Sequence, residues 1–82
     1  MEINEQSIKK ILSQVGEINK DEIETLTGDS DLRNIGIDSF TSIELVVKLE
    51  ESFDISIGDD DLSVDNVSTI NAIIELIKKY TE

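Results

Sequence analysis

Apolar residues in three segments of this 82-residue chain recur three and four positions apart, as they do along one face of an α-helix. The segments cover residues 5–15, residues 39–52 and the stretch that follows Ser68 and ends near Lys79. The chain contains no proline, so nothing in it breaks a helix prematurely. The sequence therefore predicts an all-α fold: a small four-helix bundle with three main helices, one short helix and a long first loop.

Capping residues indicate where the first helix begins and ends. Asn4 is a favourable N-cap, and Ile3 and Ile8 occupy the two positions of a hydrophobic staple. Gly16 follows the segment 5–15 and suits the left-handed conformation that closes many helices. The apolar stripe that we expect to face the core consists of Ile8, Ile11, Leu12 and Val15.

Residues 17–37 lack a regular apolar spacing and are expected to form a long connection that lies against the core. The segment 27–31, TGDSD, is rich in residues that favour turns. A short helical turn within residues 20–26 is compatible with the pattern. Loops of this length are uncommon in small domains and are often functional. The residues expected to hold the connection in place are Leu26, Leu32, Ile35 and Ile37.

The later elements are predicted in the same way. Asp38 is the expected N-cap of the second helix, and Ser68 that of the last. Residues 59–62 are expected to form the short helix, and Lys78 and Lys79 lie in the last turn of the final helix, where the helix dipole favours cations. The apolar positions of the second helix are Phe40, Ile43 and Val47, widened by Leu45, Val46, Leu49 and Phe53.

Composition limits the chemistry of the chain. It has no cysteine and no histidine, which excludes disulfides, thiolate nucleophiles, Cys/His zinc sites and imidazole bases. With so few aromatic residues, the core must be aliphatic.

The length of the chain is that of one domain spanning residues 1–82. The N-terminus has no apolar run like that of a signal peptide, and no stretch is long enough to cross a membrane, so we expect a soluble cytoplasmic protein.

The formal net charge of −12 indicates basic partners. Nucleic acid and anionic membranes are polyanions that the chain would repel, so we expect neither as a partner. We expect the chain itself to be a monomer. Nine acids and one lysine lie between residues 38 and 65, which is −8 of the total charge. The charge therefore surrounds the second helix, at whose start Ser39 offers a hydroxyl.

The acidic segments suggest calcium binding and the exposed serine suggests catalysis, but the surrounding sequence supports neither function. The segment 29–34, DSDLRN, begins like a calcium loop but has arginine at the fifth position and asparagine where glycine is required. The acids at residues 59–61 lack ligand spacing as well, so no metal site is expected. Ser39 has no histidine to activate it, and GIDSF is not a G-x-S-x-G motif, so no catalytic residue is expected. On local chemistry alone, Ser39 is a first-turn helix residue.

The segment 36–55, GIDSFTSIELVVKLEESFDI, resembles the second-helix signature of acyl carrier proteins. In that family an Asp-Ser-Leu motif carries 4′-phosphopantetheine on its serine. The resemblance continues through DDDL to VSTINAIIELI, which look like the family's short third helix and its last helix, and it is weakest over residues 1–30. The positions that fit in register are Gly36, Asp38, Ser39, Glu44, Leu45, Val46, Leu49, Glu50, Glu51, Phe53, Asp54 and Ile55.

The resemblance implies a free-standing acyl carrier protein without catalytic machinery of its own. Ser39 would hold a 4′-phosphopantetheine arm, transferred from coenzyme A by a phosphopantetheinyl transferase, and the arm would carry an acyl group as a thioester. Free N–H groups in the first helical turn would favour its phosphate. Partners would be acyl-loading ligases or transferases and synthases of fatty-acid, polyketide or nonribosomal-peptide biosynthesis. Their basic patches would dock on Asp38, Phe40, Ile43, Glu44, Glu50 and Glu51.

Two departures from the family pattern leave the pathway open. Phe40 stands where the family usually has leucine, and Thr41 stands where fatty-acid-synthesis members usually have aspartate. With these variants the chain looks like free-standing carriers of polyketide or nonribosomal-peptide pathways. An aminoacyl, peptidyl or aryl carrier of a nonribosomal pathway is an alternative, although an acid before the serine is more typical of acyl carriers. An acidic interaction module that carries no cargo is a rival of a different class.

Overall fold

The computed structural model describes residues 2–81, and within them the regular structure is entirely helical. The α-helices are α1 (Glu5–Leu12), α2 (Thr41–Phe53) and α3 (Ile70–Thr81). Short 3₁₀ helices lie in the connections: η1 (Lys20–Thr25), η2 (Leu32–Ile35), η3 (Asp59–Asp61) and η4 (Val64–Val67). The predicted all-α bundle with three main helices is therefore confirmed.

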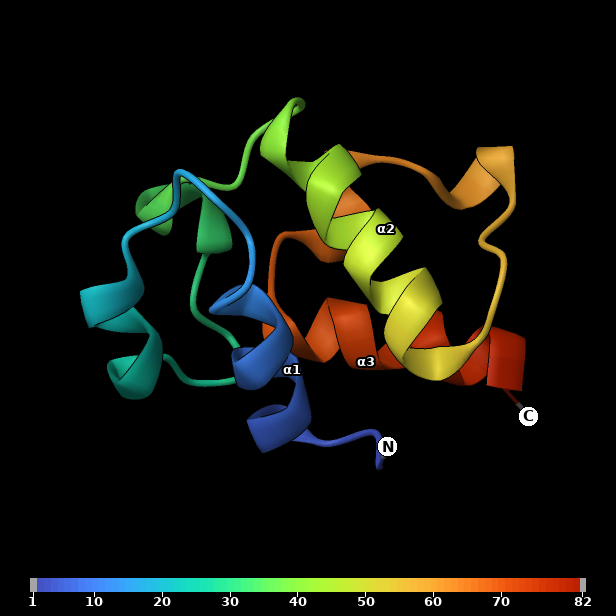
Figure 1. Ribbon diagram of the computed structural model, residues 1–82, viewed down its shortest axis with the longest axis horizontal. Helices are drawn as coiled ribbons and strands as arrows, with labels where there is room; N and C mark the ends of the chain where they lie inside the picture. Colours follow the sequence, from blue (N-terminus) through green and yellow to red (C-terminus); the bar gives the residue numbers. More distant parts are fainter. Residues whose placement is uncertain (1, 82) are drawn as a thin grey trace.

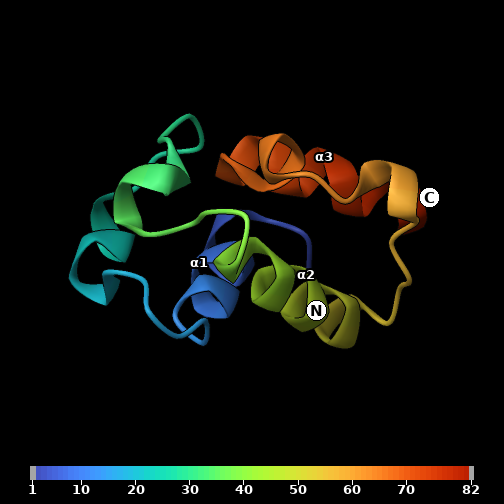
Figure 2. The ribbon, with the colours of Figure 1, turned by 90° about the horizontal axis from the view of Figure 1, so that it is seen from above.

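Helix α1 packs against both α2 and α3. Figure 2 shows α1 and α2 in one layer and α3 lying across the other side, and Figure 1 shows the long first connection beside them at one end of the molecule. The core between these elements is aliphatic, as expected from the composition. Burying an aliphatic side chain contributes about 1.5–3 kcal/mol, so these residues hold the helices together. Those buried from the three helices are Ile8, Ile11, Leu12, Leu45, Leu49, Ile70, Ile73, Leu76 and Ile77.

The predicted apolar stripe of the second helix is wrong in part. Leu45 and Leu49 are fully buried, but Phe40 and Ile43 are 71% and 66% exposed, and Val47 is 46% exposed. Apolar residues occupy more than one face of α2, and only the face with Leu45 and Leu49 meets the core. The other face is left in solvent.

The ends of α1 differ in how well they were predicted. Asn4 is the N-cap, as expected: its side chain accepts a hydrogen bond from the Ser7 amide at 2.9 Å. The helix ends at Leu12 rather than Val15, because the last turns tighten into hydrogen bonds between residues three apart. Gly16 is not the left-handed residue; Glu17 is, with φ of 66°.

The long connection contains two helical turns, of which the sequence predicted one. Residues 20–25 form η1, inside the expected range, whereas η2 was not predicted. Gly36 closes η2 with φ of 115°, and a β-carbon at this position would lie 3.0 Å from the Glu17 carbonyl oxygen. Backbone hydrogen bonds tie the connection to the rest of the chain: Asn19 donates to Ile35, and Leu32 donates to Ser68. The four residues expected to hold it against the core, Leu26, Leu32, Ile35 and Ile37, are all buried.

The segment before α3 holds one confirmed prediction and one error. Helix η3 spans Asp59–Asp61, within the range predicted for the short helix, and η4 was not predicted. Ser68 does not cap α3. The Thr69 hydroxyl accepts from the Ala72 amide at 3.0 Å, and the Ser68 hydroxyl donates instead to the Asp65 carbonyl. In the part of the chain that the structure describes, no helix is long and apolar enough to cross a membrane.

Candidate functional site

Ser39 is exposed and lies in the turn that directly precedes α2, not within the helix as predicted. Asp38 shapes this turn. Its Oδ1 accepts hydrogen bonds from the amides of Phe40 at 2.8 Å and Thr41 at 2.9 Å, and its carbonyl accepts from the Ser42 amide at 2.9 Å. Asp38 thus does the capping that the sequence assigned to it, although Phe40 is the residue next to the helix.

The hydroxyl of Thr41 holds the other side of the turn. It is buried, donates to the Gly36 carbonyl oxygen at 2.8 Å and accepts from the Asp38 amide at 2.8 Å. In the sequence Thr41 stands out only as a departure from the family pattern, and its role in the turn was not predicted. Its position three residues after Asp38, the spacing of a capping box, is the signal that indicates it.

These hydrogen bonds determine the charge beside Ser39. The backbone amides of Thr41 and Phe40, followed by the Thr41 hydroxyl, hold the pKa of Asp38 below its usual range, so its carboxylate is ionised at neutral pH. The expectation of free N–H groups in the first turn is wrong. Asp38 binds the Thr41 and Ser42 amides, and the Ile43 amide donates to the Phe40 carbonyl at 3.2 Å.

Ser39 borders an open groove of about 400 Å³ between α2 and the segment 62–64. The α2 side of the groove continues from Ser39 along one edge of the helix, and the far wall comes from the connection after η3 and the first residue of η4. Aliphatic side chains make up most of the lining. The lining residues are Ser39, Ser42, Ile43, Val46, Leu62, Ser63 and Val64.

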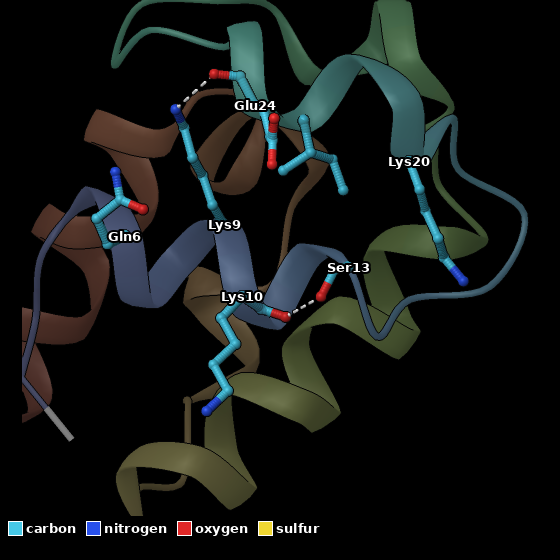
Figure 3. Close-up of a pocket in the computed structure, with 7 residues that line it drawn as sticks. Gln6, Lys9, Lys10, Ser13, Lys20 and Glu24 are labelled. Atoms are coloured by element: carbon cyan, nitrogen blue, oxygen red, sulfur yellow. Dashed lines mark hydrogen bonds between the residues drawn. The ribbon is translucent and has the colours of Figure 1, made fainter.

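A larger depression of about 550 Å³ lies between α1 and η1 (Figure 3), and Ser39 is not one of its lining residues. It contains three lysines, but they do not converge on a common point. Lys9 is already engaged: its ammonium donates to the Glu24 carbonyl at 3.3 Å and pairs with Glu5 at 3.2 Å. The amino groups of Lys10 and Lys20 point in different directions in Figure 3. This arrangement does not form a binding site for a small anion.

The structure separates the acidic residues that were expected to dock partners. Glu51 is exposed on α2. Glu44 is also exposed, and its Oε2 accepts from the Gly16 amide at 3.3 Å. Glu50 is half-buried, and its Oε2 accepts from the Ile57 amide at 2.8 Å, so this residue anchors the following loop.

The expected apolar docking residues lie together with their neighbours on the solvent side of α2. Phe40 and Ile43 are among its most exposed side chains, and Val47 follows them one turn later. Leu62, which is 46% exposed, lies across the groove. Among residues 2–81, no three acidic side chains come together in a way that could hold a metal ion.

The chain matches the family model described as "Phosphopantetheine attachment site" over residues 6–77. It is 32% identical over 72 residues to an aminoacyl carrier protein of Agrobacterium fabrum, covering 88% of this chain and 86% of that protein. It is 36% identical over 78 residues to an acyl carrier protein of Chlorobium phaeobacteroides, covering 95% and 94%.

The fold is similar to a chain in the crystal structure of an engineered Bradyrhizobium japonicum glycine:[carrier protein] ligase complexed with a carrier protein from Agrobacterium tumefaciens and ATP. The TM-score is 0.81 at 31% identity, with 92% of this chain and 96% of that chain covered. The AMP complex of the same proteins gives the same TM-score and identity. This chain therefore belongs to the phosphopantetheine-attachment family and is a carrier protein with covalently attached 4′-phosphopantetheine.

Proposed function

We propose that Ser39 is the residue that carries the phosphopantetheine arm. The observation that carries the proposal is the position of its exposed hydroxyl, at the end of the apolar groove and in the turn before α2. Ser42 also lines the groove but is only 7% exposed, and Ser63 lies on the opposite wall. Of the groove's serines, Ser39 alone follows an aspartate in the D-S pair on which the family resemblance rests.

The geometry of the turn fits an arm attached by a phosphodiester at this hydroxyl. Asp38 and Phe40 occupy the first-turn amides, so the phosphate would meet solvent rather than these N–H groups. The carboxylate of Asp38 would also repel the phosphate and favour an outward direction for the arm. The groove next to Ser39 offers apolar surface for part of the arm or its cargo.

The role of the chain's own residues is then to present the arm, not to react. The arm supplies a thiol, which forms a thioester with the cargo; the chain has no cysteine that could do so. It also lacks histidine, so it has no imidazole to act as a general base at the thioester. We therefore infer that one carrier domain spanning residues 1–82 shuttles an acyl group between partner enzymes and leaves catalysis to them.

The partners that we propose are a phosphopantetheinyl transferase and enzymes that load and use the cargo. Exposed Phe40 and Ile43 provide apolar contacts on α2, and Glu51 provides charge for a basic patch. An aminoacyl cargo is the second candidate, because one relative is an aminoacyl carrier protein and the similar solved structures contain a glycine:[carrier protein] ligase. Fatty-acid, polyketide and nonribosomal-peptide pathways are all compatible with this role.

Attachment is tested by incubating the protein with coenzyme A and a broad-specificity phosphopantetheinyl transferase, followed by intact-mass measurement. We expect one phosphopantetheine per chain, and none on Ser39→Ala. Ser63→Ala is the matched control, because Ser63 is exposed and lines the same groove. Circular dichroism establishes that each variant is folded. Full modification of Ser39→Ala, or loss of modification in Ser63→Ala alone, would show that the assignment is wrong.

A further inference from the structure

The far wall of the Ser39 groove is built by the connection after η3 and the first residue of η4. Leu62 and Ser63 lie between the two short helices, and Val64 begins η4. Leu62 is 46% exposed, and Val64 is only half-buried. Apolar packing of these three residues themselves therefore does little to fix the wall relative to α2. Buried Val67 anchors η4 on the side after the wall, and on the side before it the position of the wall depends on the contacts of the preceding residue.

Asp61, the residue immediately before the wall, provides those contacts. Both of its carboxylate oxygens accept from the Lys79 ammonium at 3.0 Å, and the Tyr80 hydroxyl donates to Oδ2. The Tyr80 oxygen accepts in turn from the Gly58 amide at 3.0 Å. We call this set, Gly58, Asp61, Lys79 and Tyr80, the Asp61 clamp. It ties the segment before the wall to the last turns of α3.

Two further hydrogen bonds support the same segment. The Asp61 carbonyl accepts from the side-chain amide of Asn66 at 2.8 Å, which links it to η4 on the other side of the wall. Glu50 on α2 accepts from the Ile57 amide at 2.8 Å. Hydrogen bonds of polar side chains therefore connect the segment around the wall to α2 and η4, and the Asp61 clamp connects it to α3.

We propose that Asp61 is a positioning residue that sets the width of the Ser39 groove and thereby shields an apolar cargo carried on the arm. The proposal rests on the proposed attachment at Ser39. An apolar cargo tethered beside the groove buries surface against Ile43, Val46 and Leu62 only if the far wall stays close to α2. Loss of the clamp frees Leu62 and Val64 to move away, and water then reaches the cargo.

The first test uses the protein without its arm and measures amide hydrogen exchange. Asp61→Ala should speed exchange at the amides of residues 62–64 at least tenfold relative to Asp59→Ala. Asp59 is the matched control, since it lies in the same short helix and carries the same charge but is outside the clamp. Tyr80→Phe, which removes only the hydroxyl, should have a smaller effect in the same place and serves if Asp61→Ala does not fold. Unchanged exchange at residues 62–64, or an equal increase in the core of α1, would overturn the proposal.

The second test measures how the wall protects a thioester. Wild type, Asp61→Ala and Asp59→Ala are loaded with an octanoyl or an acetyl thioester, and its spontaneous hydrolysis is followed by intact mass. We expect octanoyl loss to be at least threefold faster in Asp61→Ala than in Asp59→Ala, and acetyl loss to be equal, because acetyl has little apolar surface to bury against the wall. Equal octanoyl rates would refute a positioning role. Uptake of the arm by Ser39→Ala would instead refute attachment at Ser39.

Discussion

The buried hydroxyl of Thr41 donates a hydrogen bond to the carbonyl oxygen of Gly36 at 2.8 Å. This bond joins the first turn of α2 to the end of η2, and the Asp38 amide donates back to the same hydroxyl at 2.8 Å. Ser39 lies between the joined residues. Its position is therefore determined by a closed ring of hydrogen bonds, although its own side chain is exposed.

Thr41→Val should destabilise the protein by about 1–3 kcal/mol, because it leaves the Gly36 carbonyl and the Asp38 amide, whose hydrogen bonds are partly buried, without their hydroxyl partner. Chemical denaturation measures the loss. Thr41→Ser is the matched control, since it keeps the hydroxyl and should retain most of the stability. Equal losses in both variants would mean that the methyl group, not the hydrogen bonds, matters here.

Gly36→Ala should cost about 1–3 kcal/mol through backbone strain. Gly36 has φ of 115°, and an added β-carbon would lie 3.0 Å from the Glu17 carbonyl oxygen and 3.2 Å from the Ile18 α-carbon. Both neighbours are backbone atoms, which cannot easily move aside. Gly16→Ala, whose nearest contact would be 3.8 Å from a Glu44 side-chain oxygen, is the control and should change the unfolding free energy far less. Equal unfolding midpoints for the two variants would contradict this account.

Asp38 should contribute to acid sensitivity. Its pKa is lowered from 3.8 in the folded protein, so its stabilising effect is fully present above the unfolded pKa and is lost as pH falls through the lower folded value. The unfolding free energy of the wild type should therefore drop more steeply below about pH 4 than that of Asp38→Asn. Asp59→Asn removes the same charge outside this turn. If the fall in unfolding free energy at acid pH is reduced equally in Asp38→Asn and Asp59→Asn, the effect comes from net charge and not from the hydrogen bonds of Asp38.

Added salt should raise the melting temperature. The net charge is −12 and the radius of gyration is 11.3 Å, so at about 0.01 M salt the Debye length of about 30 Å lets like charges repel across the whole molecule. At about 0.1 M the length falls to about 10 Å, and much of the repulsion is screened. The exposed ion pairs, such as Arg33–Asp65, lose some attraction, but pairs of this kind contribute little. A melting temperature independent of sodium chloride concentration would contradict this balance.

Glu51→Lys should slow loading by a cognate transferase or ligase, mainly by lowering the association rate, while leaving helicity unchanged because Glu51 is exposed. The rate is measured by intact mass at low and high salt. Glu24→Lys makes the same charge change on η1 and is the control. Equal slowing by both would mean that only net charge matters. No slowing by either would shift attention to exposed Phe40 and Ile43.

Several features could be predicted from the sequence because they depend on neighbours a few positions apart. The apolar spacing predicted the three helices, and Asn4 and Asp38 were predicted as capping residues because capping is a local hydrogen bond. The D-S pair likewise indicated Ser39 as the attachment residue, which stays a prediction. Local chemistry was less decisive where two residues compete: Thr69 caps α3 in place of Ser68, and Glu17 takes the left-handed conformation in place of Gly16.

The tertiary structure decided which faces and polar side chains serve the site. Leu45 and Phe40 are both apolar residues of the α2 region, but only the packing of the other helices determines that one is buried and the other exposed. Glu50 and Asp61 look like two more acids in an acidic chain. Glu50 anchors the amide of Ile57 beyond the end of α2, and Asp61 binds Lys79 and Tyr80 of α3, which lie 18 and 19 positions later in the sequence. Such pairings depend on how the whole chain folds, and no periodicity or short motif encodes them.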